Sequence, residues 1–393
     1  MTIKIIFWLS LVVIFYSYIG YGILLWIILK VKNAFKKPVN ENFTEKFEPN
    51  VTLVVASYNE AEILKDKIKN CFELDYPVEK CQFYFIADGS NDSSTDIIAA
   101  YPGVKLFYQP QRAGKVAAIN RVMPFVTTPF VIFSDANTLL NKQCIRQIVK
   151  HYTNAKTGAV AGEKKVLDIN NSGDAAGAGE GLYWRYESFL KKLDADFYSV
   201  VGAAGELFSI RTELFEPTPT HVLLDDFIIS LTICQKGYRV AYEPNAFASE
   251  APSFSMQEEQ KRKIRISAGG FQSVVMLKSL FNIFKYGKLS FQYISHRVLR
   301  WVVCPFLLPL ALFTNIWLVA TQNETMYSWL LILQILFYLA ALLGWLFSLK
   351  NIKVKMLYVP YYFVFMNACL YIGLKRFLGN KQTVLWEKAK RKT

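Results

Sequence analysis

The chain has 393 residues, of which 53% are hydrophobic and only 19% are charged, and its formal net charge is +14. Ordinary soluble domains are about 25% charged, so this composition excludes a disordered chain and argues against a fully soluble protein. An excess of basic residues is typical of proteins that bind nucleic acid, a membrane surface or an anionic small molecule, and composition does not distinguish these.

The positive charge lies mainly in the C-terminal third. Residues 1–260 carry 26 Lys and Arg against 29 Asp and Glu, whereas residues 261–393 carry 19 Lys and Arg against two Glu. The basic part also contains most of the long apolar runs, so its charge fits lipid headgroups better than a nucleic-acid groove. We therefore expect a lipid bilayer as a partner and no nucleic acid.

Four apolar stretches reach the roughly 20 residues that a helix needs to cross a bilayer. They are residues 5–31, 301–320, 329–349 and 356–374. The first is far longer than the ~7–15-residue core of a signal peptide, so we expect an anchor that is not cleaved. Tyr and Trp near the ends of the later stretches are typical of membrane interfaces.

The positive-inside rule orients the first span, because four lysines follow it within residues 30–37 and only Lys4 precedes it. The N-terminus is then outside, and the region after residue 50 is cytoplasmic, in an integral protein of the plasma (cell inner) membrane. Four complete spans would also put the tail outside, although residues 375–393 carry seven Lys and Arg. Either the last stretch does not cross completely or the rule fails there, and the sequence leaves both open.

The region after the first span alternates short apolar runs with helical patterns. Strands are predicted at residues 51–56, 83–87, 104–108 and 130–134, and helices at 60–74, from Ser94 or Thr95 to 101, and 115–123. This alternation predicts a doubly wound parallel sheet, in which ligands bind beyond the carboxyl ends of the strands. No GxGxxG follows the first strand and no GxxxxGK[ST] is present, which argues against nicotinamide, flavin and P-loop folds.

Polar turns follow each predicted strand, and further short motifs come later. In order they read VVASYNE (54–60), DGS (88–90), RAGK (112–115), DAN (135–137), GAAGELFSIR (202–211) and LLDDF (223–227). Together they resemble the family 2 glycosyltransferases, inverting membrane-bound enzymes that include bacterial polysaccharide synthases. The resemblance covers residues 51–272 and implies an α/β GT-A (nucleotide-diphospho-sugar transferase) domain plus transmembrane α-helices.

The resemblance implies that the first three motifs bind the donor. Ser57, Tyr58 and Glu60 would contact its base or ribose, and Asp88 would bind the uracil or ribose. Lys115 lies beside the N-terminus of a predicted helix, where a diphosphate is favoured. Each motif alone also fits an ordinary turn with capping residues.

Asp135 and Asn137 resemble the DxD motif that holds a divalent metal, Mg²⁺ or Mn²⁺, on the donor diphosphate. Asn replaces the second Asp, which removes one negative charge from the expected ligand set. In isolation, the same residues fit a turn after a buried strand.

Asp225 and Asp226 resemble the family's Thr-Glu-Asp motif, with Asp226 at the position of the general base. The base removes the proton of the acceptor hydroxyl as it attacks, which requires no large pKa shift. Asp225 would orient Asp226 or an acceptor group. Two acidic residues at a helix start are also favourable with the helix dipole alone.

The segment 202–211 resembles the acceptor-binding part of the family. Gly205 lets backbone approach a sugar, and Glu206 and Arg211 are candidates to contact its hydroxyls. The same segment also fits a glycine-containing loop that enters a strand.

One further motif departs from the family pattern. Processive members carry Gln-x-x-Arg-Trp near the membrane, whereas this chain has Arg262, Arg265 and Ile266 at those positions. Arg262 and Arg265 remain candidates to bind the donor diphosphate. A basic helix on anionic lipids is the other interpretation, and both can hold.

These observations predict a glycosyltransferase that moves a sugar from a nucleotide-sugar, expected to be a UDP-sugar, to a membrane-associated glycan or lipid-linked acceptor, in cell-surface polysaccharide or glycolipid synthesis. The loss of the Trp favours a single addition, whereas several C-terminal helices favour processive synthesis. The alternative function is a non-catalytic nucleotide-sugar-binding subunit that regulates a partner synthase.

The expected domains are a first span (1–31), a basic linker (32–50), a catalytic domain (51–256), a basic amphipathic interfacial region (257–300), two to three spans (301–374) and a basic tail (375–393).

Overall fold

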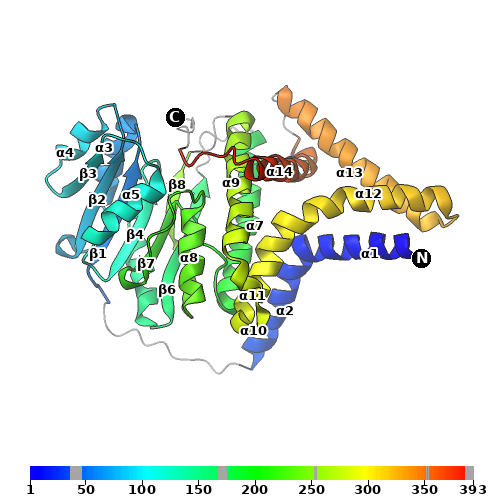
Figure 1. Ribbon diagram of the computed structural model, residues 1–393, viewed down its shortest axis with the longest axis horizontal. Helices are drawn as coiled ribbons and strands as arrows, with labels where there is room; N and C mark the ends of the chain where they lie inside the picture. The colour runs from blue at the N-terminus through cyan, green and yellow to red at the C-terminus, as the bar shows by residue number, and fades with distance from the viewer. Residues whose placement is uncertain (36–46, 167–174, 252–254, 351, 353, 386–393) are drawn as a thin grey trace.

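The computed structural model describes the whole chain except residues 36–46, 167–174, 252–254, 351, 353 and 386–393. Most of the predicted linker and the end of the tail therefore lie outside the described residues. The rest forms an α/β domain at one end of the molecule and long helices that project from the other end (Figure 1).

The α/β domain is built on one eight-stranded sheet with the order β3-β2-β1-β4-β7-β6-β8-β5. Its strands are β1 (Val51–Ser57), β2 (Cys81–Asp88), β3 (Val104–Gln109), β4 (Phe130–Asp135), β5 (Leu139–Leu140), β6 (Thr157–Val166), β7 (Leu207–Arg211) and β8 (Arg239–Glu250). The four predicted strands are β1 to β4, and they pair in parallel as expected. The whole sheet is mixed and not purely parallel, because β7 runs antiparallel to both β4 and β6, whereas β6 and β8 pair in parallel.

Helices cover both faces of the sheet, because the strand side chains alternate between two cores. Leu53 and Val55 of β1 join the core under α3 (Ala61–Phe72), α4 (Ser94–Ala99) and α6 (Cys144–Val149), whereas Val54 joins the core under α5 (Lys115–Val122) and α8 (Asp225–Gln235). The cores place the carboxyl ends of β1, β2 and β4 at one rigid edge.

The loops at this edge are tied to one another. The amide of Asn59 donates to Asn91 at 2.8 Å, and the backbone N–H of Asn91 donates back to Asn59 at 2.9 Å. The predicted cap of α4 is wrong: Ser93 is at the N-cap position, and the carboxylate of Asp92 accepts from the backbone of Ser94 instead. These bonds hold the turns after β1 and β2 in a fixed position.

The described chain has four helical segments that are long and apolar enough to cross a membrane. Their bounds are Thr2–Ala34, Lys288–Thr321, Thr325–Leu349 and Met356–Leu378. The first is α1 (Thr2–Phe15) and α2 (Tyr21–Ala34) joined by a π-helical turn, and α1 packs along α12 (Cys304–Thr321). Lys4 and Glu324 form an ion pair of 2.5 Å, so the N-terminus lies beside the link between α12 and α13 (Thr325–Leu349).

The fourth segment is arranged differently. α14 (Lys355–Leu378) packs along α9 (Met256–Met276), where a β-carbon at Gly373 would lie 2.5 Å from the β-carbon of Ser267. Figure 1 shows α14 nearly end-on, whereas α1, α12 and α13 lie across the view. Residues 382, 383 and 385, just after α14, line the same cavity as Asp135. The chain therefore returns to the α/β domain after α14, which accords with an incomplete last crossing.

Candidate active site

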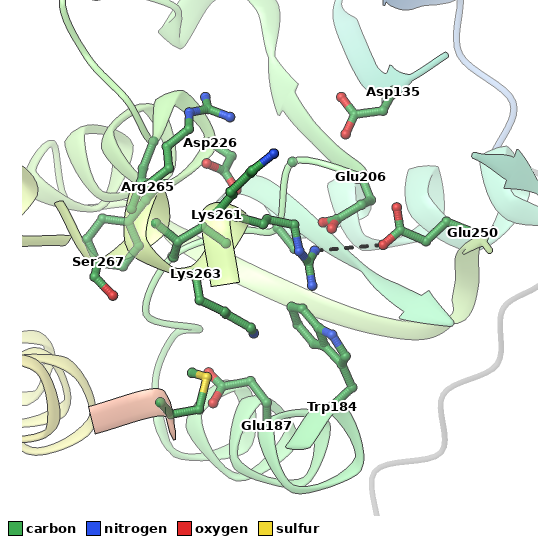
Figure 2. A pocket seen from close by; sticks show the side chains of 18 of the residues that line it. Asp135, Trp184, Glu187, Glu206, Asp226, Glu250, Lys261, Lys263, Arg265 and Ser267 are labelled. Atoms are coloured by element: carbon green, nitrogen blue, oxygen red, sulfur yellow. Dashed lines mark ion pairs between the residues drawn. The ribbon is translucent and has the colours of Figure 1, made fainter. Parts of the chain in front are cut away.

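One large cavity, of about 1630 Å³, lies where the carboxyl ends of β1 and β4 meet α9, α14 and the first membrane helix. Figure 2 shows part of its lining, with Asp135 at one end and Glu187 at the other. Most of the predicted site residues line it: Tyr58, Glu60, Lys115, Asp135, Asn137, Gly205, Glu206, Asp225, Asp226, Arg262 and Arg265. Ser57, Asp88 and Arg211 do not.

Lys115, the first residue of α5, links the RAGK motif, which follows β3, to the DAN motif at the end of β4. Its Nζ donates to Asp135 Oδ1 at 2.6 Å and to the carbonyl of Gly205 at 3.4 Å. Burial lowers the pKa of this ammonium, but Asp135, Asp225 and Asp226 outweigh burial and raise it. Lys115 therefore remains a cation in the cavity, as the binding of a diphosphate requires.

Asp225 and Asp226 are the first two residues of α8. Burial, together with the negative charge of Asp225, raises the pKa of Asp226 to about 7, against the opposing effect of Lys115. This differs from the expectation that no large shift is needed, because the sequence does not show how deeply the pair is buried. A pKa near neutrality makes Asp226 a stronger base while leaving a large fraction ionised.

Phe227 and Gly202 fix the position of this pair. Gly202 has φ +89°, and a β-carbon there would lie 2.1 Å from the ring of Phe227. The Ser230 hydroxyl, one turn into α8, accepts from the backbone of Ala203 at 3.0 Å. The loop before β7 thus packs directly on the first turn of α8.

Asp88 and Ser57 shape the site from outside the cavity. Asp88 accepts from the backbone N–H groups of Ala113 and Gly114, at 3.1 and 2.7 Å, and so holds the RAGK loop in place. The Ser57 hydroxyl donates to the carbonyl of Ile86 at 2.9 Å. In this structure both residues bond to the backbone of neighbouring segments, whereas direct contact with a nucleoside was expected.

Tyr58 and Glu60 both line the cavity, at the end of β1. The guanidinium of Arg112 lies 3.5 Å from the centre of the Tyr58 ring. One face of this ring is therefore covered, and a base that stacks on Tyr58 has to use the other face or displace Arg112.

Glu206 takes part in a buried group of charges with Lys164, Glu250 and Arg262. Its carboxylate accepts from Lys164 Nζ at 2.8 Å, and Lys164 also pairs with Glu250. Arg262 lies 3.8 Å from Glu250, the ion pair drawn in Figure 2. Burial raises the pKa of Glu206, but Lys164 outweighs burial and lowers it, so the carboxylate is ionised.

Arg211 lies outside the cavity, contrary to its predicted acceptor role. Its guanidinium donates to the backbone carbonyls of Thr157 and Tyr152, at 2.8 and 3.0 Å. It pairs in register with Phe130, the first residue of β4, at the edge of the sheet opposite to the site. Its role is to tie the strand ends together.

The α9 motif faces the cavity. The side chains of Arg262 and Lys263 are only 16% and 4% exposed, and Arg265 donates to the carbonyl of Leu223 at 3.4 Å. These cations therefore point into the protein, where α9 lies between the α/β domain and α14. Both arginines line the same cavity as Lys115 and Asp135.

The sequence motifs missed a second part of the cavity. It is formed by Trp184, Glu187 and Lys191 of α7 (Ala175–Phe197) and by Arg297 and Arg300 of the π-helix Tyr293–Val303. Glu187 pairs with both arginines and with His296. The spacing of the α7 residues, at i, i+3 and i+7, places them on one helix face and is the signal that could have found them.

The residues present fit a divalent ion only if the donor diphosphate supplies further oxygen ligands. Asp135, one-third exposed, and Asn137 both line the cavity, and Lys115 now lies against Asp135 Oδ1. No group of three or more His, Cys, Asp or Glu side chains suited to a metal occurs among the described residues. Mg²⁺ is often held by one or two carboxylates plus substrate phosphates, so Asp135 and Asn137 suit a metal that arrives with a diphosphate.

Residues 52–217 match the family model described as "Glycosyl transferase family 2". This domain belongs to glycosyl transferase family 2. The fold and the family predicted from the motifs are therefore confirmed, and the domain is that of a glycosyltransferase.

Curated relatives include two polysaccharide synthases. The chain is 24% identical over 278 residues to the poly-beta-1,6-N-acetyl-D-glucosamine synthase of Staphylococcus aureus strain COL, covering 66% of this chain and 65% of that protein. It is 25% identical over 283 residues to the synthase of the same name from Staphylococcus epidermidis, covering 67% and 66%. The matches thus span about two thirds of the relatives' length.

A solved structure shares the fold over nearly the whole chain. The mannosyltransferase PcManGT from Pyrobaculum calidifontis, determined in complex with GDP-Man and Mn²⁺, superposes with a TM-score of 0.70 at 21% identity. The superposition covers 96% of this chain and 100% of that protein. The glycosyltransferase domain therefore has the GT-A fold, together with a similar set of helices.

Proposed function

We propose that this protein is an inverting glycosyltransferase that transfers a sugar from a nucleotide-sugar, a UDP-sugar in our proposal, to a membrane-associated glycan or lipid-linked acceptor. The observation that carries the proposal is a single cavity that contains Lys115, Asp135 and Asp226 and continues to the membrane helices. The names of the staphylococcal relatives support a place in cell-surface polysaccharide synthesis. The catalytic domain would lie in the cytoplasm, where nucleotide-sugars are made.

In the proposed reaction, Asp226 accepts the proton of the acceptor hydroxyl while that oxygen attacks the anomeric carbon of the donor sugar. The bond to the nucleoside diphosphate breaks in the same displacement, so the configuration inverts. Lys115 and Arg265 offset the negative charge that develops on the leaving diphosphate. Asp225, at the start of α8, orients Asp226.

Asp135 and Asn137 would hold a divalent metal on the diphosphate. The metal would supply further neutralisation of charge on the leaving group. We propose Mg²⁺ or Mn²⁺, because oxygen ligands from a carboxylate, an amide and phosphates suit such hard cations.

The test is transfer and hydrolysis by the purified full-length protein with a panel of UDP- and GDP-sugars, with and without Mn²⁺. We expect one UDP-sugar to be consumed at least 10-fold faster than the others, with the rate dependent on Mn²⁺ or Mg²⁺. No turnover of any donor, despite nucleotide binding, would instead support a binding subunit without catalytic activity.

A further inference from the structure

The half of the cavity next to the membrane helices has largely apolar walls. Tyr18 and Ile19 come from the first membrane helix, and Phe363, Met366 and Leu370 come from α14. These side chains suit an aliphatic chain better than a sugar. Since the same cavity contains Asp226, a ligand with an apolar tail can reach the proposed base from this side.

Three lysines surround the indole ring of Trp184, and two of them, Lys191 and Lys263, line the cavity. The Nζ atoms of Lys164, Lys191 and Lys263 lie 5.0, 5.5 and 5.8 Å from the ring of Trp184, within the range of cation–π attraction. In Figure 2, Trp184 and Lys263 lie between Asp226 above and Glu187 below. The Glu187 side of this group adjoins the apolar walls, because Arg300 pairs with Glu187 and lies 5.8 Å from the ring of Tyr18.

Lys191 differs from the other two lysines in its partners. Lys164 pairs with Glu206 and Glu250, and Lys263 lies 3.5 Å from Glu259. Lys191 is only 2% exposed, and its Nζ has no hydrogen-bond or ion-pair partner among the described residues.

Glu187, one helical turn away from Lys191, already has ion-pair partners. Glu187 pairs with His296, Arg297 and Arg300. A buried ammonium without a counter-ion is unfavourable, and buried charges in proteins are normally paired. Because Lys191 lines the cavity, a ligand can supply the missing anion.

We propose that Lys191, with Trp184 and Lys263, binds the phosphate of an acceptor whose phosphate is carried on an apolar chain. The apolar walls take the chain, the lysines take the phosphate oxygens, and the part of the acceptor beyond the phosphate extends toward Asp226. The inference rests on the proposed function, because it assigns the acceptor of the same site. The positive charge of the lysines matches the phosphate of such a lipid, and the apolar walls match its chain.

The experiment measures binding to the full-length protein in nanodiscs of neutral phosphatidylcholine. The probes are farnesyl phosphate, farnesol and inorganic phosphate, and UDP binding reports on the donor side. We expect farnesyl phosphate to bind at least 10-fold more tightly than either of the other two probes. Lys191→Met should weaken this binding at least 10-fold, and Lys191→Arg should retain most of it.

Lys192→Met is the matched control, since Lys192 is the next residue of α7 and is exposed. It should bind farnesyl phosphate and UDP like the wild type. UDP binding by Lys191→Met should also be unchanged, which shows that the variant is folded. If that variant does not fold, the three probes on the wild type and the Lys191→Arg variant decide the question.

Several results would overturn the inference. Equal affinity for farnesol and farnesyl phosphate would show that the phosphate does not contribute to binding. Equal affinity for inorganic phosphate and farnesyl phosphate would show that the apolar chain does not contribute. Unchanged binding by Lys191→Met removes the role of Lys191. Lys191-dependent binding of a hyaluronan oligosaccharide in place of farnesyl phosphate assigns the site to an anionic glycan. Lys191-dependent lipid binding by a protein that binds no nucleotide supports the subsite and contradicts only the proposed transfer.

Discussion

The environment of Asp226 imposes opposite requirements on activity and stability. Burial and the charge of Asp225 hold the pKa of Asp226 at about 7, well above its usual range. The folded protein therefore binds a proton at Asp226 that the unfolded chain has already lost between about pH 4 and 7. Its stability falls over that range as pH rises, because the folded state must then carry a buried carboxylate.

Asp226→Asn should lower the transfer rate by about 10²–10⁴-fold, because a general base contributes that much. The same change should raise the melting temperature at pH 8 by at least ~1 °C, which corresponds to about 1 kcal/mol in a protein of this size. The gain should shrink at pH 5, where the wild-type carboxyl is protonated in the folded state. Rates with the consumed donor and melting curves at both pH values test this, with the exposed Asp196→Asn as control.

The pH dependence of kcat/KM should show the same group. Because the base has to be ionised, kcat/KM should rise with pH through about 7 and then level off. In Asp226→Asn, the kcat/KM that remains should no longer rise with pH through about 7. A wild-type profile that is flat from pH 5.5 to 8.5 would contradict the assignment of Asp226 as the base.

The loop before β7 and the first turn of α8 act as one positioning element. Gly202→Ala should lower stability by about 1–3 kcal/mol and lower the transfer rate, because the new methyl group displaces Phe227, next to Asp226. Gly237→Ala is a close control, with φ +91° against +89° and nothing within 4 Å of its β-carbon. It carries the backbone strain without the clash, so equal losses of activity in both variants would contradict the positioning role.

The sequence predicted which residues meet around Lys115 and Asp135, because they lie in short turns after strands. β1, β2 and β4 have continuous apolar runs, and the polar residues that follow them have to meet at one edge of a parallel sheet. Asp135 and Lys115 come together for that reason, although the spacing did not show that they form an ion pair. Asp88 lies at the end of β2 as predicted, but it does not line the cavity, and its hydrogen bonds to the backbone of Ala113 and Gly114 were not predicted.

The membrane half of the site could not be predicted in the same way. Glu187 and Lys191 lie on a long helix, and the ion-pair partners of Glu187 come from a segment more than 100 residues away. Such contacts depend on how α7 packs against α14 and the π-helix, which local patterns do not determine. The antiparallel β7 was missed because β-strand propensity does not specify pairing direction.

The path of the chain through the membrane concerns the whole molecule. If α14 does not cross, the tail and the α/β domain are on one side and the α12–α13 link is on the other. Cysteines introduced at Lys381 and at Lys65 should then react with an impermeant maleimide from the same side, and one at Asn323 from the opposite side. The six natural cysteines are buried, so they should give little background.

Labelling at residue 381 from the side of Asn323 would show four complete crossings and would contradict this topology. The position is informative because Lys381 is exposed and immediately follows α14. The charge pattern then also has a simple explanation, because the basic tail lies beside the domain and not across the bilayer from it.

The first helix has a consequence for how substrates meet. Its 33 residues extend about 50 Å at 1.5 Å per residue, against roughly 30 Å of hydrocarbon. The excess, including Tyr21, Leu25 and Leu29, packs on Leu190 and Leu193 of α7, so the anchor and the helix that carries Lys191 form one body. If the acceptor is a lipid, as we propose, the entrance to the site is then held at a constant depth, and the acceptor needs only lateral diffusion in two dimensions to reach it. The rate at low acceptor content should then follow the number of acceptor molecules per unit area of bilayer, and not their number per unit volume of suspension.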